Sequence, residues 1–105
     1  MVIVETRVFT RRVRELLSDE EYRDLQIALV NRPIVGAVIV GSGGLRKLRW
    51  TVKGKGKRGG LRVIYYWATL QDQLLMLFIY RKSERDDLTR DQLKTLKKIV
   101  EEEYP

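Results

Sequence analysis

The sequence predicts an α+β fold, in which a small antiparallel sheet packs with two N-terminal helices and one C-terminal helix. The expected sheet is a three-stranded meander plus a short N-terminal strand. Segments rich in β-branched and aromatic residues are grouped between residues 45 and 80, and helical periodicities lie on either side. Such grouping favours antiparallel pairing. A chain of 105 residues has room for one modest core, so residues 1–105 are expected to form a single domain.

The N-terminal third is expected to contain a short strand and two helices. The apolar run Val2–Val4 predicts the strand, and apolar residues between positions 9 and 17 then recur at helical spacing. Ser18 with Glu21 three residues later is the pattern of a capping box, so a second helix is expected to begin there. Pro33 ends it, because the residue before a proline avoids the helical region.

The middle of the chain is expected to form the sheet. Residues 45–52 and 61–68 predict two strands joined by a charged loop, and the continuous apolar run 74–80 predicts a central strand that is buried on both faces. Residues 38–40 form either a brief strand or an extended segment. A second capping-box pattern begins at Thr89, and the apolar stripe that follows it predicts the C-terminal helix.

The composition excludes several kinds of site. The chain contains neither cysteine nor histidine, which removes disulfides, zinc–thiolate sites and the usual general acid or base. A metal site would have to be built from carboxylates alone, and neither a metal nor another cofactor is expected. No apolar run reaches the roughly 20 residues that cross a bilayer, and the first ten residues lack the apolar core of a signal peptide. A cytoplasmic location without membrane contact is therefore expected.

The positive charge is concentrated in one segment. The net charge is +7, and eight basic residues lie between positions 46 and 62 with no acidic residue among them. The rest of the chain has 13 basic and 14 acidic residues, so the whole excess comes from this segment. A focused field of this kind suits nucleic acid, and the alternative is a solvated, charged hairpin loop. The eight residues are Arg46, Lys47, Arg49, Lys53, Lys55, Lys57, Arg58 and Arg62.

The loop between the first two meander strands contains Gly54-x-Gly56-x-x-Gly59, which matches the dinucleotide-binding pattern. That pattern has a mechanism only between a strand and the N-terminus of a helix. Here it joins two expected strands, so it is interpreted as a flexible basic hairpin loop. Its lysines are expected to supply electrostatic attraction to RNA, because a flexible loop does not hold side chains with the precision that catalysis needs.

Cations and aromatic residues are expected to meet on the sheet. Lys47 and Arg49 are two residues apart on one strand and therefore project from the same face. Arg62 begins the next strand, while Tyr80 and Lys82 end the third. Arginine and lysine can hold phosphates, and aromatic rings can stack on unpaired bases. The tyrosines have a second interpretation, which is packing in the core.

RNA cleavage does not require histidine, because the 2′-hydroxyl of RNA is itself a nucleophile. Cleavage needs that oxygen to be activated, the charge on phosphorus to be stabilised and the leaving 5′-oxygen to be protonated. Fixed cations can perform the second task. A lysine crowded by other cations, or a tyrosine, can perform the first or the third. The residues present permit this chemistry.

Several blocks of the sequence, in order and over most of the chain, resemble the HigB branch of the RelE toxin superfamily. The central block is the most specific of them. The resemblance implies a RelE-like α+β toxin of a type II toxin–antitoxin pair, which is a metal-independent endoribonuclease that cuts mRNA on the ribosome and thereby inhibits translation. The blocks are Leu17–Tyr22, Gly43–Arg49, Lys53–Gly60, Arg62–Tyr66, Phe78–Lys82 and Asp87–Thr89.

The resemblance also implies roles and partners. The partners are mRNA on the ribosome, ribosomal RNA and an antitoxin, which in this branch is commonly a helix-turn-helix protein from the adjacent gene. Ser83 and Thr89 stand where other RelE members carry an arginine and a tyrosine, so Tyr66 or Tyr80 is expected to take the aromatic role. The residues expected to be catalytic are Lys47, Arg49, Arg62, Tyr80 and Lys82, and those expected to bind RNA are Arg46, Lys53, Lys55, Lys57, Arg58 and Tyr66.

Two other functions fit the residues. The first is a non-catalytic RNA- or ribosome-binding domain on the same scaffold, which would bind ribosomes and leave mRNA intact. The second is a basic DNA-binding module, although neither helical segment is strongly basic on one face, as a helix-turn-helix would require.

Overall fold

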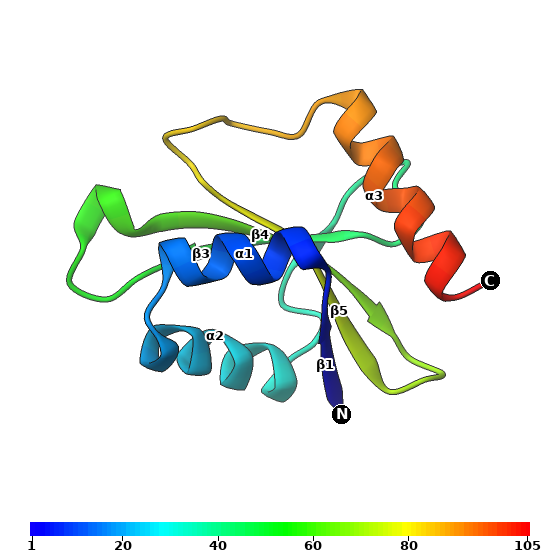
Figure 1. Cartoon of the computed structure of the whole chain (residues 1–105), viewed down its shortest axis with the longest axis horizontal. Coiled ribbons are helices and arrows are strands. Elements are labelled where there is room, and N and C mark those ends of the chain that lie inside the picture. Colours follow the sequence, from blue (N-terminus) through cyan, green and yellow to red (C-terminus); the bar gives the residue numbers. More distant parts are fainter.

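The computed structural model describes the backbone of all 105 residues and the side chains of residues 1–56 and 59–105. Three helices and five strands follow one another along the chain (Figure 1). A short 3₁₀ turn, η1, lies in the hairpin between β3 and β4. The elements are β1 (Val2–Glu5), α1 (Arg7–Leu16), α2 (Asp19–Asn31), β2 (Ala37–Val38), β3 (Arg46–Thr51), η1 (Gly56–Gly59), β4 (Gly60–Ala68), β5 (Gln73–Arg81) and α3 (Arg90–Glu103).

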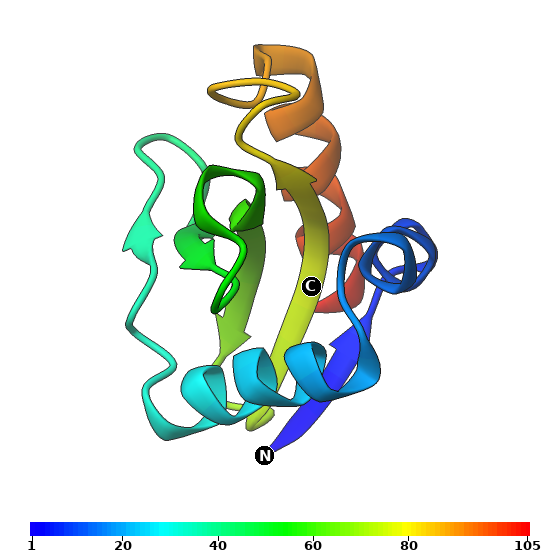
Figure 2. The same cartoon turned by 90° about the vertical axis from the view of Figure 1, so that its left-hand side faces the viewer.

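The α+β class is confirmed, but the sheet is mixed and not wholly antiparallel. Its order is β1-β5-β4-β3-β2, and Figure 2 shows β1 and β2 at its two edges. Strands β2 to β5 pair antiparallel, as short connections allow, whereas β1 lies parallel to β5. Parallel neighbours require a long crossover connection, and here most of the chain separates these two strands.

The structure has one strand more than the expected four. Strand β2 pairs with β3 over two residues, with Ala37 opposite Lys47 and Val38 opposite Arg46. It begins one residue before the segment 38–40 that the sequence indicated. Such a short strand depends on contacts made by its flanks, which are described below.

The helix boundaries follow local signals. Ser18 and Thr89 both form complete capping boxes, with Glu21 and Gln92 respectively, as predicted. Helix α1 ends at Leu16, one residue before the end of the apolar pattern that predicted it. Within the described residues, no helix is long and apolar enough to span a bilayer.

The two faces of the sheet carry separate apolar clusters. Helices α1 and α2 cover one face and α3 covers part of the other, so that α2 and α3 lie on opposite sides of the sheet in Figure 1. Strand β5 contributes to both clusters, which confirms that it is buried on both faces. Because α3 covers only part of its face, the remainder stays open. We call this face the α3 face and the opposite one the α2 face.

Candidate functional site

A row of polar side chains crosses the open part of the α3 face. In the strand register Arg49 of β3 lies opposite Arg62 of β4, and Arg62 lies opposite Tyr80 of β5. Lys47 lies two residues before Arg49 on the same strand and therefore on the same face. Backbone pairing, and not loop conformation, thus holds four of the five expected catalytic residues together.

Lys82 completes this group. It follows β5 directly, and its amide donates a hydrogen bond to the Gly60 carbonyl at 3.0 Å, beside the start of β4. Among the described residues, no carboxylate forms an ion pair with Arg49, Arg62 or Lys82. We call the hollow of about 640 Å³ at this position the cationic hollow, and it is lined by Arg49, Thr51, Gly56, Gly60, Arg62, Lys82 and Ser83.

Tyr80 lies beneath this row and not on its surface. Its side chain is fully buried, and its hydroxyl has no hydrogen-bond partner in the described part of the chain. Burial raises the pKa of Tyr80, and the charge of Asp87 raises it further, against the opposing effect of Arg62 and Arg85. The phenol therefore stays protonated at neutral pH and is able to donate a hydrogen bond.

Arg85, which no sequence pattern indicated, covers the rings of Phe78 and Tyr80. Its guanidinium carbon lies 5.8 Å from the centre of the Tyr80 ring and 5.9 Å from that of Phe78. Arg85 lies outside the basic segment in a mixed-charge loop, so neither charge density nor strand alternation indicated it. The lack of an arginine at position 83 was the only available signal that another cation takes this place.

Two ion pairs fix the loop between β5 and α3, one to strand β3 and one to helix α1. The Lys47 ammonium lies 2.7 Å from Asp87 Oδ1, and Arg12 lies 2.8 Å from Glu84 Oε2. Arg12 also donates to the Ile79 carbonyl at 2.7 Å. In Figure 1 this loop arches from the end of β5 to the start of α3. It therefore borders the site, and Lys47 is engaged in the state described here.

The sequence matches a known protein family over almost its whole length. A sequence model described as the RelE toxin of the RelE/RelB toxin–antitoxin system matches residues 1–104. The chain belongs to the RelE toxin family. The placement in the HigB branch stays a prediction.

Two solved structures share the fold of this RelE-family chain. The chain from the crystal structure of the intact E. coli RelBE toxin–antitoxin complex has a TM-score of 0.59 at 12% identity, over 76% of this chain and 94% of that one. A mutant of the E. coli toxin RelE in the free state has a TM-score of 0.58 at 11% identity, over 81% of this chain and 86% of that one. At such identities the likeness shows the fold alone.

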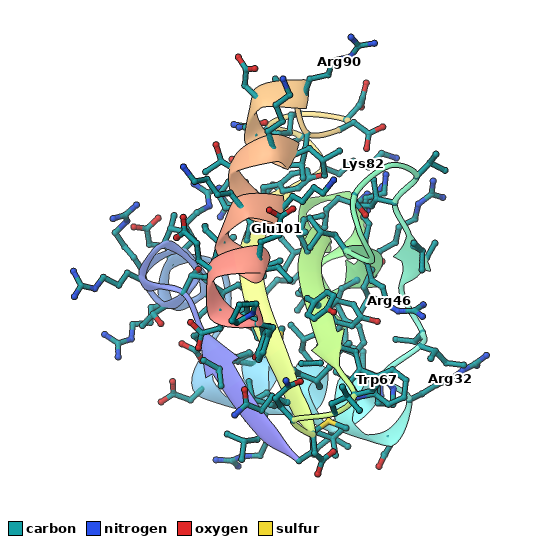
Figure 3. The ribbon with its side chains drawn as sticks, turned by 90° about the vertical axis from the view of Figure 1, so that its right-hand side faces the viewer. Arg32, Arg46, Trp67, Lys82, Arg90 and Glu101 are labelled. Carbon is teal, nitrogen blue, oxygen red and sulfur yellow. The ribbon has the colours of Figure 1, made fainter. Side chains whose placement is uncertain are left out.

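Arg46, which was expected to bind RNA, lies on the α2 face of this RelE-family chain. It is paired with Tyr65, a member of the α2-face cluster. Its guanidinium donates to the carbonyls of Gly36 at 2.7 Å and Ile34 at 3.2 Å. Figure 3 shows it well separated from Lys82. Arg46 thus fixes the segment before β2 and does not lie beside Arg49, Arg62 and Lys82.

The remaining residues expected to bind RNA are also spread out. Lys53 and Lys55 are exposed in the hairpin, but the Lys55 ammonium lies 3.4 Å from Glu21 of α2, towards the α2 face. Tyr66 lies on the α3 face and stacks on Tyr104, with ring centres 5.8 Å apart. Lys57 and Arg58 lie outside the described side chains.

Proposed function

We propose that this chain is the toxin of a type II toxin–antitoxin pair and cuts mRNA on the ribosome, which inhibits translation. The observation that carries the proposal is a cationic row, formed by Arg49, Arg62 and Lys82, which lies above the buried phenol of Tyr80. The chain that carries this row belongs to a family of toxins. Fixed cations without carboxylate partners are suited to the charge that develops on a phosphate in the transition state.

The proposed reaction uses the 2′-hydroxyl of RNA as nucleophile. The 2′-oxygen attacks phosphorus and the bond from phosphorus to the 5′-oxygen breaks, which leaves a 2′,3′-cyclic phosphate and a 5′-hydroxyl. Arg62, at the centre of the row, stabilises the charged phosphate, and Arg49 positions the backbone. Lys47 and Lys82 move the two protons, so that the 2′-hydroxyl loses its proton as the leaving 5′-oxygen gains one. No metal takes part in these steps.

Tyr80 supports this arrangement from below. Its raised pKa keeps the phenol protonated, and its buried hydroxyl has no hydrogen-bond partner among the described residues, so an unused donor lies beneath the phosphate site. The full burial of its ring excludes base stacking in the state described here. Tyr80 therefore orients groups in the site and does not receive a base.

The partners follow from charge and family. The exposed lysines of the hairpin attract ribosomal RNA, and such contacts make binding dependent on salt. The similar RelBE structure is a toxin–antitoxin complex, which supports an antitoxin for this chain, and a helix-turn-helix protein from the adjacent gene is the expected one. Controlled expression of this chain should arrest growth, and co-expression of that neighbour should relieve the arrest.

The direct test compares two arginine variants in an active translation extract. Arg62→Ala should reduce mRNA cleavage by roughly 10²–10³-fold, the usual effect of losing one transition-state donor. Arg81→Ala is the matched control, because Arg81 precedes Lys82, is exposed and alternates to the α2 face. Equal cleavage by Arg62→Ala and wild type would refute the role of Arg62, and absence of cleavage by wild type would refute the enzyme itself.

A further inference from the structure

A second pocket adjoins the cationic hollow. It has a volume of about 730 Å³ and lies between the β2–β3 edge and the start of α3. Its walls are mainly aliphatic, and its charged members lie on β3 and in the β5–α3 loop. It shares Arg49 with the cationic hollow, so the two spaces adjoin. We call it the aliphatic pocket, and it is lined by Val35, Ala37, Val38, Ile39, Lys47, Leu48, Arg49, Ile64, Asp87, Leu88 and Leu93.

The aromatic rings of the α3 face are not available to hold a base. Tyr80 is fully buried and Tyr66 is stacked on Tyr104. The Phe78 ring is covered by two guanidinium groups, those of Arg12 at 5.0 Å and Arg85 at 5.9 Å. Within the described side chains of this face, an RNA base next to the bound phosphate therefore has an aliphatic surface to contact and no open aromatic ring.

We propose that the aliphatic pocket binds one nucleobase of the RNA whose phosphate lies on Arg49 and Arg62, and that Asp87 reads its edge. This inference rests on the proposed function and deepens it by assigning a base-binding site. The pocket lies within the usual size range for small-molecule sites, and an apolar wall with a few convergent polar groups is their common composition. The sharing of Arg49 favours a base over an apolar protein side chain, because the backbone of the same RNA would already occupy the adjoining hollow.

The polar groups at the pocket predict which bases fit. The Asp87 carboxylate can only accept hydrogen bonds when ionised, and its contact with Lys47 at 2.7 Å fixes its position. Adenine, cytosine and guanine each carry an exocyclic amino group that can donate to a carboxylate. Uracil carries none, and its single N3–H donor is flanked by two carbonyl oxygens that repel a carboxylate. The pocket therefore favours a base with an amino group and disfavours uracil.

The wall formed by β2 is held in place before RNA arrives. The Tyr65 hydroxyl donates to the Pro33 carbonyl at 2.7 Å and accepts from the Gly36 amide at 2.9 Å. Arg46 binds the Gly36 carbonyl from the same side, and the Ile39 amide donates to the Leu45 carbonyl at 2.8 Å. A wall fixed by this many contacts is suited to selecting one base shape.

The first test fills the pocket with a side chain. Ala37 is exposed and shares the face of Lys47, so Ala37→Trp places an indole in the pocket without displacing core residues. Val40→Trp is the matched control, because Val40 is 94% exposed and does not line the pocket. Both variants and wild type are assayed on ribosomes with a series of mRNAs. Each of these mRNAs carries a single abasic nucleotide, at a different position around the cut.

For wild type and Val40→Trp, removing the base at one position should lower cleavage by about tenfold, the scale of a single base contact. Ala37→Trp should lower cleavage of intact mRNA by a similar factor and show no further loss with the abasic mRNA, because both changes remove the same contact. Losses that multiply would overturn the pocket assignment while the proposed function stands. Absence of cleavage by wild type would overturn both.

The second test changes the hydrogen-bonding groups of Asp87 without changing the shape of the pocket. Asp87→Asn should reduce the preference for amino-bearing bases over uracil at that position by about tenfold, the scale of one base-edge contact. Asp86→Asn makes the same change of charge at the exposed neighbouring residue and should leave the preference unchanged. Identical base preference in Asp87→Asn and wild type would contradict the assignment of Asp87.

Loss of antitoxin binding in Ala37→Trp, together with losses on abasic mRNA that multiply, would assign the pocket to a protein partner instead.

Discussion

Replacing Tyr65 by phenylalanine tests how the segment that carries β2 is held. The Tyr65 ring is fully buried on the α2 face, and its hydroxyl bridges the Pro33 carbonyl and the Gly36 amide. Tyr65→Phe keeps the ring and removes only the oxygen. The Gly36 amide then loses its partner in a buried position, while the Pro33 carbonyl lies nearer to solvent.

The size of the effect follows from these contacts. Leaving one buried backbone donor without a partner costs about 1–3 kcal/mol, so we expect a loss of about 2 kcal/mol in the free energy of unfolding. For a domain of this length each kcal/mol lowers Tm by roughly 4–8 °C. The melting temperature should therefore fall by roughly 8–16 °C, and cleavage should fall with it because the pocket wall is loosened.

Thermal and urea unfolding followed by circular dichroism measure this loss. Tyr66→Phe is the control, because no hydrogen bond of the Tyr66 hydroxyl occurs among the described contacts, and its stability should change by less than about 0.5 kcal/mol. Equal stabilities of Tyr65→Phe and wild type would refute the bridge as a structural contact.

Three further predictions concern the edges of the site. Burial alone would raise the pKa of Glu84, but Arg12 and Arg81 lower this pKa below its ordinary 4.5. Wild type should therefore be more stable than Glu84→Gln at neutral pH. Urea titrations should show this difference disappear as the pH falls below that value. Gly36→Ala places a Cβ 2.7 Å from Tyr65 Cε1 and should cost about 1–3 kcal/mol in the same unfolding assay. Filter binding measures the negative slope of log K for RNA binding against log salt concentration. Lys82→Ala should make this slope shallower by about 0.7, and an unchanged slope would remove Lys82 from the phosphate site.

Local features of the fold were predictable from the sequence. The capping boxes at Ser18 and Thr89 depend on residues three positions apart, and strand alternation placed Lys47 and Arg49 on one face. Their signals lie within a few residues of the structure that they specify. The parallel pairing of β1 with β5 is different, because it depends on packing between distant parts of the chain.

The candidate site also combines features that local sequence patterns predict with features that depend on contacts between distant residues. Strand alternation alone separates Arg46 from Lys47, whereas the charge density of the basic segment predicts a single surface. The structure follows the alternation and places Arg46 on the α2 face. The pairing of Lys55 with Glu21 joins residues 34 positions apart, and the contact of Arg85 with Tyr80 depends on the path of a loop. No local pattern specifies either contact.

The most direct test of the account uses mRNA with a single 2′-deoxynucleotide on the 5′ side of the cut, in purified ribosomal complexes. If the RNA supplies the nucleophile, as proposed, wild-type protein should cut the all-ribose message and leave a 2′,3′-cyclic phosphate. It should leave the deoxy-substituted message intact at that bond. Cleavage of both messages at the same position would contradict the account.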